Sequence, residues 1–123
     1  MESNKGRLIT IIRSQAELFL KEMGEFFPFG TYINGKGIIV PVGAFTEEEN
    51  PASIDLINML SNYIHNKLIE GDCTIAAIAI DSIIRENGQA FDAIEVRLFE
   101  NESENIEKVY LKYKIEEHGV SFI

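Results

Sequence analysis

The stretch that decides the fold is Glu25–Ala44, which reads EFFPFGTYINGKGIIVPVGA. Two segments rich in aromatic and β-branched residues, 26–34 and 38–44, flank an Asn-Gly-Lys-Gly sequence at positions 34–37. Aromatic and β-branched side chains favour strands, and Asn and Gly tolerate the positive φ angles of tight turns. Pro28 and Pro41 each remove a backbone donor, which strand starts, edges and bulges tolerate. The stretch therefore predicts a β-hairpin.

Helical patterns flank this hairpin on both sides. From about Asn4 to Met23 apolar residues recur every three or four positions, Ser3 or Asn4 is placed to cap the helix, and Gly24 to end it. The second pattern starts with Asn50 as the N-cap and Pro51 at the first helical position, and it runs to Glu70. The apolar arc of the first helix covers roughly 200°, against the ~100° that a surface helix needs. We expect that helix to lie between the sheet and the second helix, or to form a subunit interface.

The C-terminal half alternates with a period of two. We expect strands at Cys73–Ile84, Gln89–Glu100 and Ile106–Glu116, with Asn87-Gly88 as a hairpin turn and Val120–Ile123 as a possible short addition. The order is therefore α-β-β-α-β-β-β. The simplest arrangement that buries both helical stripes is a single α+β domain over residues 1–123, with two helices on one face of a five-stranded, mainly antiparallel sheet.

Two resemblances follow from this pattern. The element order resembles that of roadblock and profilin-like domains, which carry a similar hairpin, helix and meander. The segments EFFPFG (25–30) and VGAFTEEENPAS (42–53) also resemble a set of small bacterial α+β proteins with no assigned activity. Neither resemblance implies an activity or assigns functional residues to this chain.

Charge and composition narrow the classes of partner. The chain has 11 basic and 20 acidic residues, a net charge of −9, and its lysines and arginines are scattered singly along the sequence. Such a charge repels nucleic acid and anionic membranes, so neither is an expected partner. The longest apolar run, Ile75–Ile80, is too short to cross a bilayer. The N-terminus lacks the pattern of a signal peptide, and the lone Cys73 cannot form an internal disulfide. These features favour the cytoplasm.

Catalytic and metal-binding patterns are weak. Gly35-Lys36-Gly37 lacks the spacing of a phosphate-binding loop and joins two strands. The run Glu47-Glu48-Glu49 is typical of a solvated loop before a helix, because adjacent carboxylates do not converge on one ion without help from the backbone. An enzyme that uses Cys73 or Asp81 with His65 is the least favoured hypothesis. We expect no enzymatic activity, no metal and no cofactor.

A ligand pocket between the hairpin and the second helix is one functional hypothesis. Phe26, Phe29 and Tyr32 are expected either to line this pocket or to belong to the core, with His65 or Asp81 orienting a ligand. Asp81 ends the apolar strand TIAAIAI (74–80). We expect its side chain to share a face with Arg97 and to form a cross-strand ion pair with it. The alternative for Asp81 is a polar anchor in the ligand site.

The leading hypothesis is a protein-interaction domain that acts as a homodimer. If both helices cover one face of the sheet, the other face exposes aromatic and small apolar groups unless the C-terminal tail or the loop at 101–105 covers it. The residues expected on that face are Ile75, Ala77, Phe91, Phe99 and Tyr110. The first helix offers Ile11 and Leu18 as a second candidate interface. Self-association or another protein is thus the expected partner, and a small-ligand-binding domain is the alternative.

Overall fold

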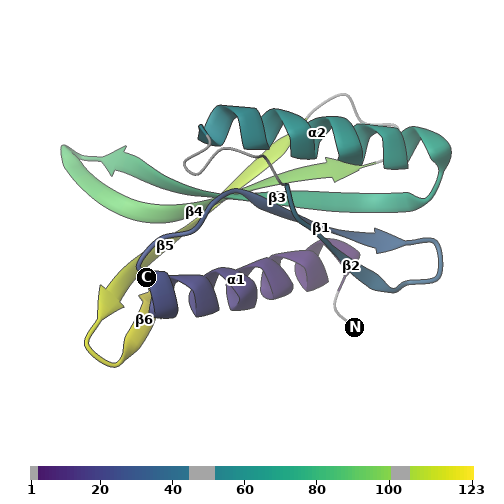
Figure 1. Cartoon of the computed structure of the whole chain (residues 1–123). Coiled ribbons are helices and arrows are strands. Elements are labelled where there is room, and N and C mark those ends of the chain that lie inside the picture. Colours follow the sequence, from purple (N-terminus) through teal and green to yellow (C-terminus); the bar gives the residue numbers. More distant parts are fainter. Residues whose placement is uncertain (1–2, 45–51, 101–105) are drawn as a thin grey trace.

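The computed structural model describes residues 3–44, 52–100 and 106–123 as two helices and six strands (Figure 1). The helices are α1 (Asn4–Met23) and α2 (Ser53–Glu70). The strands are β1 (Phe29–Asn34), β2 (Ile39–Val42), β3 (Cys73–Glu86), β4 (Gln89–Glu100), β5 (Glu107–Glu116) and β6 (Gly119–Phe122). The α+β class and the antiparallel pairing predicted from the sequence are confirmed.

The sheet has the order β2-β1-β3-β4-β5-β6 and lies between the two helices (Figure 1). The prediction of two helices on one face was wrong. The reason lies in β3, whose residues are apolar on both sides of the strand. Ile75, Ala77 and Ala79 are buried in one cluster with α1, while Ala76, Ile78 and Ile80 are buried in a second cluster with α2. A strand that is apolar on both faces needs a covering layer on each.

The prediction of five strands was also wrong. Gly119–Phe122 turns back at Glu117-His118 and pairs antiparallel with the C-terminal end of β5, from Tyr113↔Phe122 to Glu116↔Gly119. Val120 and Phe122 thereby pack against the α1 cluster. The short terminal segment is a sixth strand because its alternate apolar side chains reach the core that α1 forms with the sheet.

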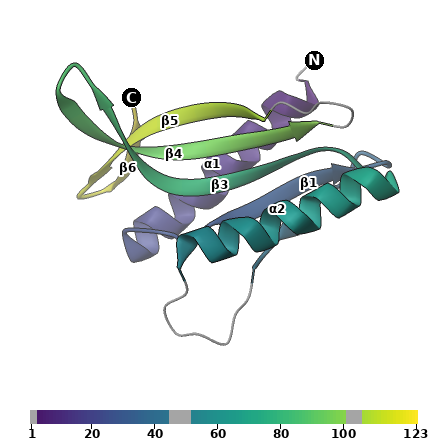
Figure 2. The same cartoon turned by 90° about the horizontal axis from the view of Figure 1, so that it is seen from above.

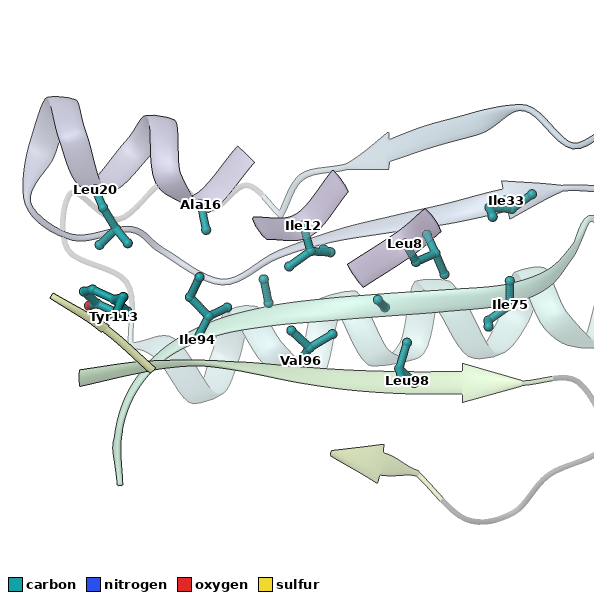
Figure 3. Packing of buried hydrophobic residues seen from close by; sticks show 12 residues of the cluster. Leu8, Ile12, Ala16, Leu20, Ile33, Ile75, Ile94, Val96, Leu98 and Tyr113 are labelled. Carbon is teal, nitrogen blue, oxygen red and sulfur yellow. The ribbon is translucent and has the colours of Figure 1, made fainter. Parts of the chain in front are cut away.

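The larger core joins α1 to the sheet (Figure 3). The buried stripe of the helix consists of Leu8, Ile12, Ala16 and Leu20, spaced three to four residues apart as one helical face requires. It packs on side chains from four strands, namely Ile33, Ile75, Ala77, Ala79, Ile94, Val96, Leu98 and Tyr113. The wide apolar arc of α1 is thus explained by contact with many strands of the sheet, and the second helix takes no part in it.

The second core lies under α2, which packs mainly on β1 and β3. Leu60 and Ile64 of the helix pack on Tyr32 and Ile78. Gly30 of β1 lies under this helix: a Cβ at this position would come within 3.6 Å of the Ile64 side chain and within 3.3 Å of the Ala77 carbonyl oxygen. Figure 2 shows that β4 and β5 extend beyond α2 on this side of the sheet. The part of this face that β4 and β5 form is therefore left open by α2.

The predicted turns and helix ends are mostly confirmed. The Asn34 side chain accepts hydrogen bonds from the backbone N–H groups of Lys36 and Ile38, at 2.9 and 3.0 Å, and thereby closes the first hairpin. Asn87-Gly88 forms a two-residue turn with positive φ at both positions.

Helix α1 is capped by the Ser3 hydroxyl, and the left-handed residues Gly24 and Gly71 end the two helices as predicted. The start of α2 differs from the prediction, since Ala52 is the N-cap. The predicted capping residues at 50–51, the acidic run at 47–49 and the loop at 101–105 lie outside the described residues. Neither described helix combines the length and hydropathy that a membrane span needs.

The central packing role of α1 gives a test of the fold. Ile12 is fully buried between α1 and the sheet, so Ile12→Ala should lower the free energy of unfolding by about 2–5 kcal/mol. Leu18 on the same helix is 54% exposed, and Leu18→Ala should cost less than about 1 kcal/mol. Urea unfolding of the two variants measures both values. Equal losses would show that α1 does not pack on the sheet through Ile12.

Candidate functional site

A cleft of about 510 Å³ lies at the end of the molecule where α1 stops and α2 begins. It is formed by the last turns of α1, the segment 25–29, the residues after β2, the start of α2 and the middle of β3. We call it the aromatic cleft, and its lining consists of Phe19, Met23, Glu25, Phe26, Phe27, Pro28, Phe29, Gly43, Ala44, Ser53 and Asp81. The described part of this lining is thus mostly apolar, with two carboxyl groups.

The phenylalanines of the cleft hold one another in place. The Phe29 ring makes edge-to-face contacts with Phe19 and Phe26, with ring centroids 5.4 and 5.5 Å apart. Phe26 and Phe29 are half-buried against the α1 core. Phe27 is 57% exposed. Phe26 and Phe29 therefore belong both to the hydrophobic core and to the wall of the cleft.

Asp81 is the half-buried polar group of the cleft. The Tyr113 hydroxyl donates to Asp81 Oδ1 at 2.5 Å, and the Phe26 backbone N–H also bonds to this carboxyl group. Burial raises the pKa of Asp81, and the nearby Asp92 and Glu25 add to that rise, while the two hydrogen bonds oppose it. Burial and the bond to Asp81 likewise raise the pKa of Tyr113. The Asp81 carboxyl group is therefore held in a fixed orientation in surroundings of low polarity.

The predicted ion pair between Asp81 and Arg97 was wrong. In the β3–β4 register Asp81 lies opposite Ile94, so its side chain shares the α1 face with Ile94 and Tyr113. Arg97 lies on the other face, where its Nε donates to Glu95 Oε2 at 2.6 Å. The other interpretation of Asp81, a polar anchor in a ligand site, stays a prediction.

The structure brings together three of the five predicted ligand residues, namely Phe26, Phe29 and Asp81. Tyr32 is 8% exposed in the α2 cluster, and His65 is exposed on α2; neither lines the cleft. The other residue considered for chemistry, Cys73, is fully buried at the start of β3, and burial raises the pKa of its thiol. Over residues 3–44, 52–100 and 106–123, no three His, Cys, Asp or Glu side chains are grouped to hold a metal ion.

The predicted interface residues fall on two sides of the molecule. Phe91, Phe99 and Tyr110 share the part of the α2 face that α2 leaves open, with Phe99 also reaching the α2 core. Ile11 and Leu18 belong to α1 on the opposite side of the sheet. The expectation that Ile75 and Ala77 are exposed was wrong, because α1 buries both.

Sequence reasoning missed two parts of the cleft. Phe19 and Met23 follow the spacing of the apolar residues of α1, yet 41% and 74% of their surface is exposed at the C-terminal end of this helix. Tyr113 was not recognised as the partner of Asp81. Its signal was present in the alternation of β5, which places Tyr113 on the side of Ile94, and in the Asn87-Gly88 turn, which sets the register of β3.

No protein-family model matches this chain, and neither the curated proteins nor the solved structures that were compared with it gave a match. The assignment of function therefore depends on the geometry of the chain itself.

The raised pKa of Asp81 predicts a particular pH dependence. A carboxyl group whose pKa is higher in the folded state favours folding at low pH, and that contribution is lost as the pH rises through the folded-state pKa. Asp81→Asn keeps an oxygen that accepts from Tyr113 and Phe26 but does not titrate. The free energy of unfolding of Asp81→Asn, relative to wild type, should therefore be higher at pH 7 than at pH 4.

Urea unfolding at the two pH values measures this difference. The same substitution at Asp55, which is exposed in the first turn of α2, is the control and should show no such rise. A relative stability of Asp81→Asn that stays constant or falls from pH 4 to pH 7 would contradict the account of Asp81.

Proposed function

We propose that the chain is a non-enzymatic binding domain whose aromatic cleft takes a small molecule with an apolar, preferably aromatic, body and a positively charged head. One observation carries the proposal. Among the described residues that line the cleft, two carry carboxyl groups, Glu25 and Asp81, and none carries a positive charge. Aromatic walls and fixed acids together favour an apolar cation.

The size and walls of the cleft suit the apolar body. Its volume of about 510 Å³ falls within the ~300–1,000 Å³ typical of small-molecule sites. Phe29 is fixed by its two ring neighbours, so little side-chain freedom is lost when a ligand packs on it. The exposed Phe27 and Met23 at the rim offer further apolar area that a ligand would bury.

The two acids suit the charged head. Asp81 uses part of its acceptor capacity on Tyr113 and Phe26, and a carboxylate has about four acceptor directions in total. Glu25 is exposed in the same lining. An ammonium group that approaches Asp81 gains a hydrogen bond in a half-buried setting and neutralises a charge that burial makes unfavourable.

The absence of a catalytic role is part of the proposal, and two placements support it. The Cys73 thiol is buried with a raised pKa, which is the opposite of an activated nucleophile. Asp81 is held by Tyr113, and His65 lies outside the cleft lining. Asp81 therefore has an orienting role in this account, because neither Cys73 nor His65 is among the described residues that line the cleft with it.

Self-association is a second candidate function, and the exposed end of α1 favours it. Leu18, Phe19 and Met23 are 54%, 41% and 74% exposed there, and the adjacent Phe27 is 57% exposed. Apolar side chains gathered in this way mark interaction surfaces. Light scattering separates the two candidates, because a dimer formed through this end would dissociate in Met23→Glu, whereas a ligand-binding monomer has one mass in both proteins.

Ligand binding is tested with three probes that share a phenyl ring, namely phenethylamine, 2-phenylethanol and 3-phenylpropionate. Amide chemical shifts followed in an NMR titration should show the amine binding most tightly, the alcohol more weakly and the carboxylate least. Asp81→Asn should lower the affinity for the amine about fivefold, which corresponds to ~1 kcal/mol for a partly exposed charge pair. The affinity for the alcohol should not change.

Two further variants complete this experiment. Phe29→Ala should weaken the binding of all three probes because it removes the ring on which they pack. Tyr110→Ser, on the open half of the sheet, is the matched control and should leave all three unchanged. Equal affinity for amine and carboxylate, or an amine affinity that Asp81→Asn does not alter, would overturn the proposed cationic ligand.

A further inference from the structure

The open half of the α2 face gathers positive charge. In the β4–β5 register Arg97 lies opposite Lys108, and Lys112, four residues further along β5 on the same side, lies opposite Ala93. Lys114 follows on the same side of β5 by the same alternation. These four residues, Arg97, Lys108, Lys112 and Lys114, form what we call the basic sheet face. They are four of the 11 basic residues in a chain of net charge −9.

These four residues are separated along the chain, so no run of basic residues marks the face in the sequence. Two of the four charges have acidic partners, with Arg97 bonded to Glu95 and Lys112 Nζ 2.5 Å from Glu86 Oε2. Lys108 and Lys114 are exposed and form no ion pair with any described residue. Among the described residues, these two positive charges of the face therefore have no acidic partner.

Within the described ranges, one edge of β5 next to this face is unpaired. The strand pairs with β4 on one side over Glu107–Lys112 and with β6 on the other side over Tyr113–Glu116. Among the described residues, nothing pairs with that other side over 107–111. The Ile123 N–H bonds to the Lys112 carbonyl oxygen, so the backbone of Lys112 points to the β6 side. By alternation the N–H and C=O groups of Tyr110 and Lys108 point to the same side and lie on the free edge.

A hollow of about 250 Å³ adjoins this edge. It is lined by α1, by β5 and by the C-terminal end of the chain, namely by Arg13, Tyr110, Leu111, Lys112, Phe122 and Ile123. The Arg13 guanidinium stacks over the Phe122 ring, 4.3 Å from its centroid. The free edge thus has the basic sheet face on one side. At the end nearest β6 it adjoins the apolar Phe122 and the cationic Arg13.

We propose that the free edge of β5 binds an extended acidic segment of a partner protein as an added strand. The backbone of the segment pairs with Lys108 and Tyr110. Alternate side chains of an added strand point to opposite faces. Acidic residues at every second position meet Lys108 and the basic sheet face, and apolar residues between them lie on the other side toward Phe122.

The same features disfavour two other occupants. A second copy that paired antiparallel through this edge, centred on Tyr110, would place Lys108 opposite Lys112 of the other copy, and like charges opposed across strands are unfavourable. A nucleic acid has no peptide backbone to pair with the free N–H and C=O groups, and the net charge of −9 repels it. An acidic peptide can pair with the lysine charges and also form backbone hydrogen bonds with the free edge.

The test uses a fluorescein-labelled peptide of seven residues that alternates Glu and Val, with binding followed by anisotropy at 0.15 M salt. The peptide should bind wild type, and a Lys–Val peptide of the same length should not. The double variant Lys108→Glu with Lys114→Glu should weaken binding at least tenfold. The matched control, Lys21→Glu with Lys36→Glu, makes the same change of charge at two exposed lysines and should alter binding less than twofold.

Pairing with the edge is tested separately from charge. Two Glu–Val peptides N-methylated at alternate positions carry identical charge but block opposite sets of N–H groups. One of them should lose binding and the other should retain it, and the retained peptide should slow hydrogen exchange at the Lys108 and Tyr110 amides. Asp81→Asn should leave peptide binding unchanged, because the aromatic cleft is a separate site.

Three results would overturn the inference. The first is equal binding of the Glu–Val and Lys–Val peptides. The second is equal weakening by the two double variants, which would show a general charge effect. The third is binding of an oligothymidylate at the same salt concentration while the Glu–Val peptide does not bind, which would identify the face as a nucleic-acid surface.

Discussion

The structure depends on one constraint, the need to bury β3 on both of its faces. Residues 75–80 of this strand are buried without exception, odd positions under α1 and even positions under α2. Such a strand can be stable only at the centre of a sheet with a helix on each side. The three-layer arrangement follows from it, as does the position of β1 and β4 as the neighbours of β3.

The two helices meet this constraint unequally, and the candidate sites are where they leave surface uncovered. Helix α1 packs across strands from β1 to β6, and its last turn extends past the core, so Phe19 and Met23 reach the aromatic cleft. Helix α2 packs mainly on β1 and β3, so charged and aromatic side chains of β4 and β5 remain exposed or only partly buried. The aromatic cleft and the basic sheet face thus result from the same packing arrangement. The cleft favours a positively charged ligand, and the basic sheet face favours a negatively charged one.

Much of the fold was predictable because its signals are local. Gly24, Gly71 and the Asn87-Gly88 turn mark ends and reversals through the backbone conformations that they permit. The layer arrangement was mispredicted although the run TIAAIAI contained the signal: it has no polar residue in either alternation after Thr74. We interpreted it as a strand of a one-sided sheet, and the helices were accordingly placed together.

The sites were harder to predict because they depend on register between distant strands. Counting back from Glu86 and forward from Gln89 across the two-residue turn places Asp81 opposite Ile94, which assigns Asp81 to the α1 face and away from Arg97. The basic sheet face required the β4–β5 register, and the loop between those strands gives no such count. Phe26, Phe29 and Asp81 were identified because aromatic residues and a lone acid beside apolar runs are conspicuous in sequence; Tyr113 was missed because its role exists only through that register.

The most direct test of this account is a methyl NOE experiment that reports which helix lies over each face of β3. The account predicts NOEs from the Ile78 methyl groups to Leu60 and Ile64 of α2, and from Ile75 to Leu8 or Ile12 of α1, with no exchange of partners between the two sets. NOEs from Ile78 to α1, or from both isoleucines to the same helix, would contradict the burial of β3 between two helices and with it the positions of both candidate sites.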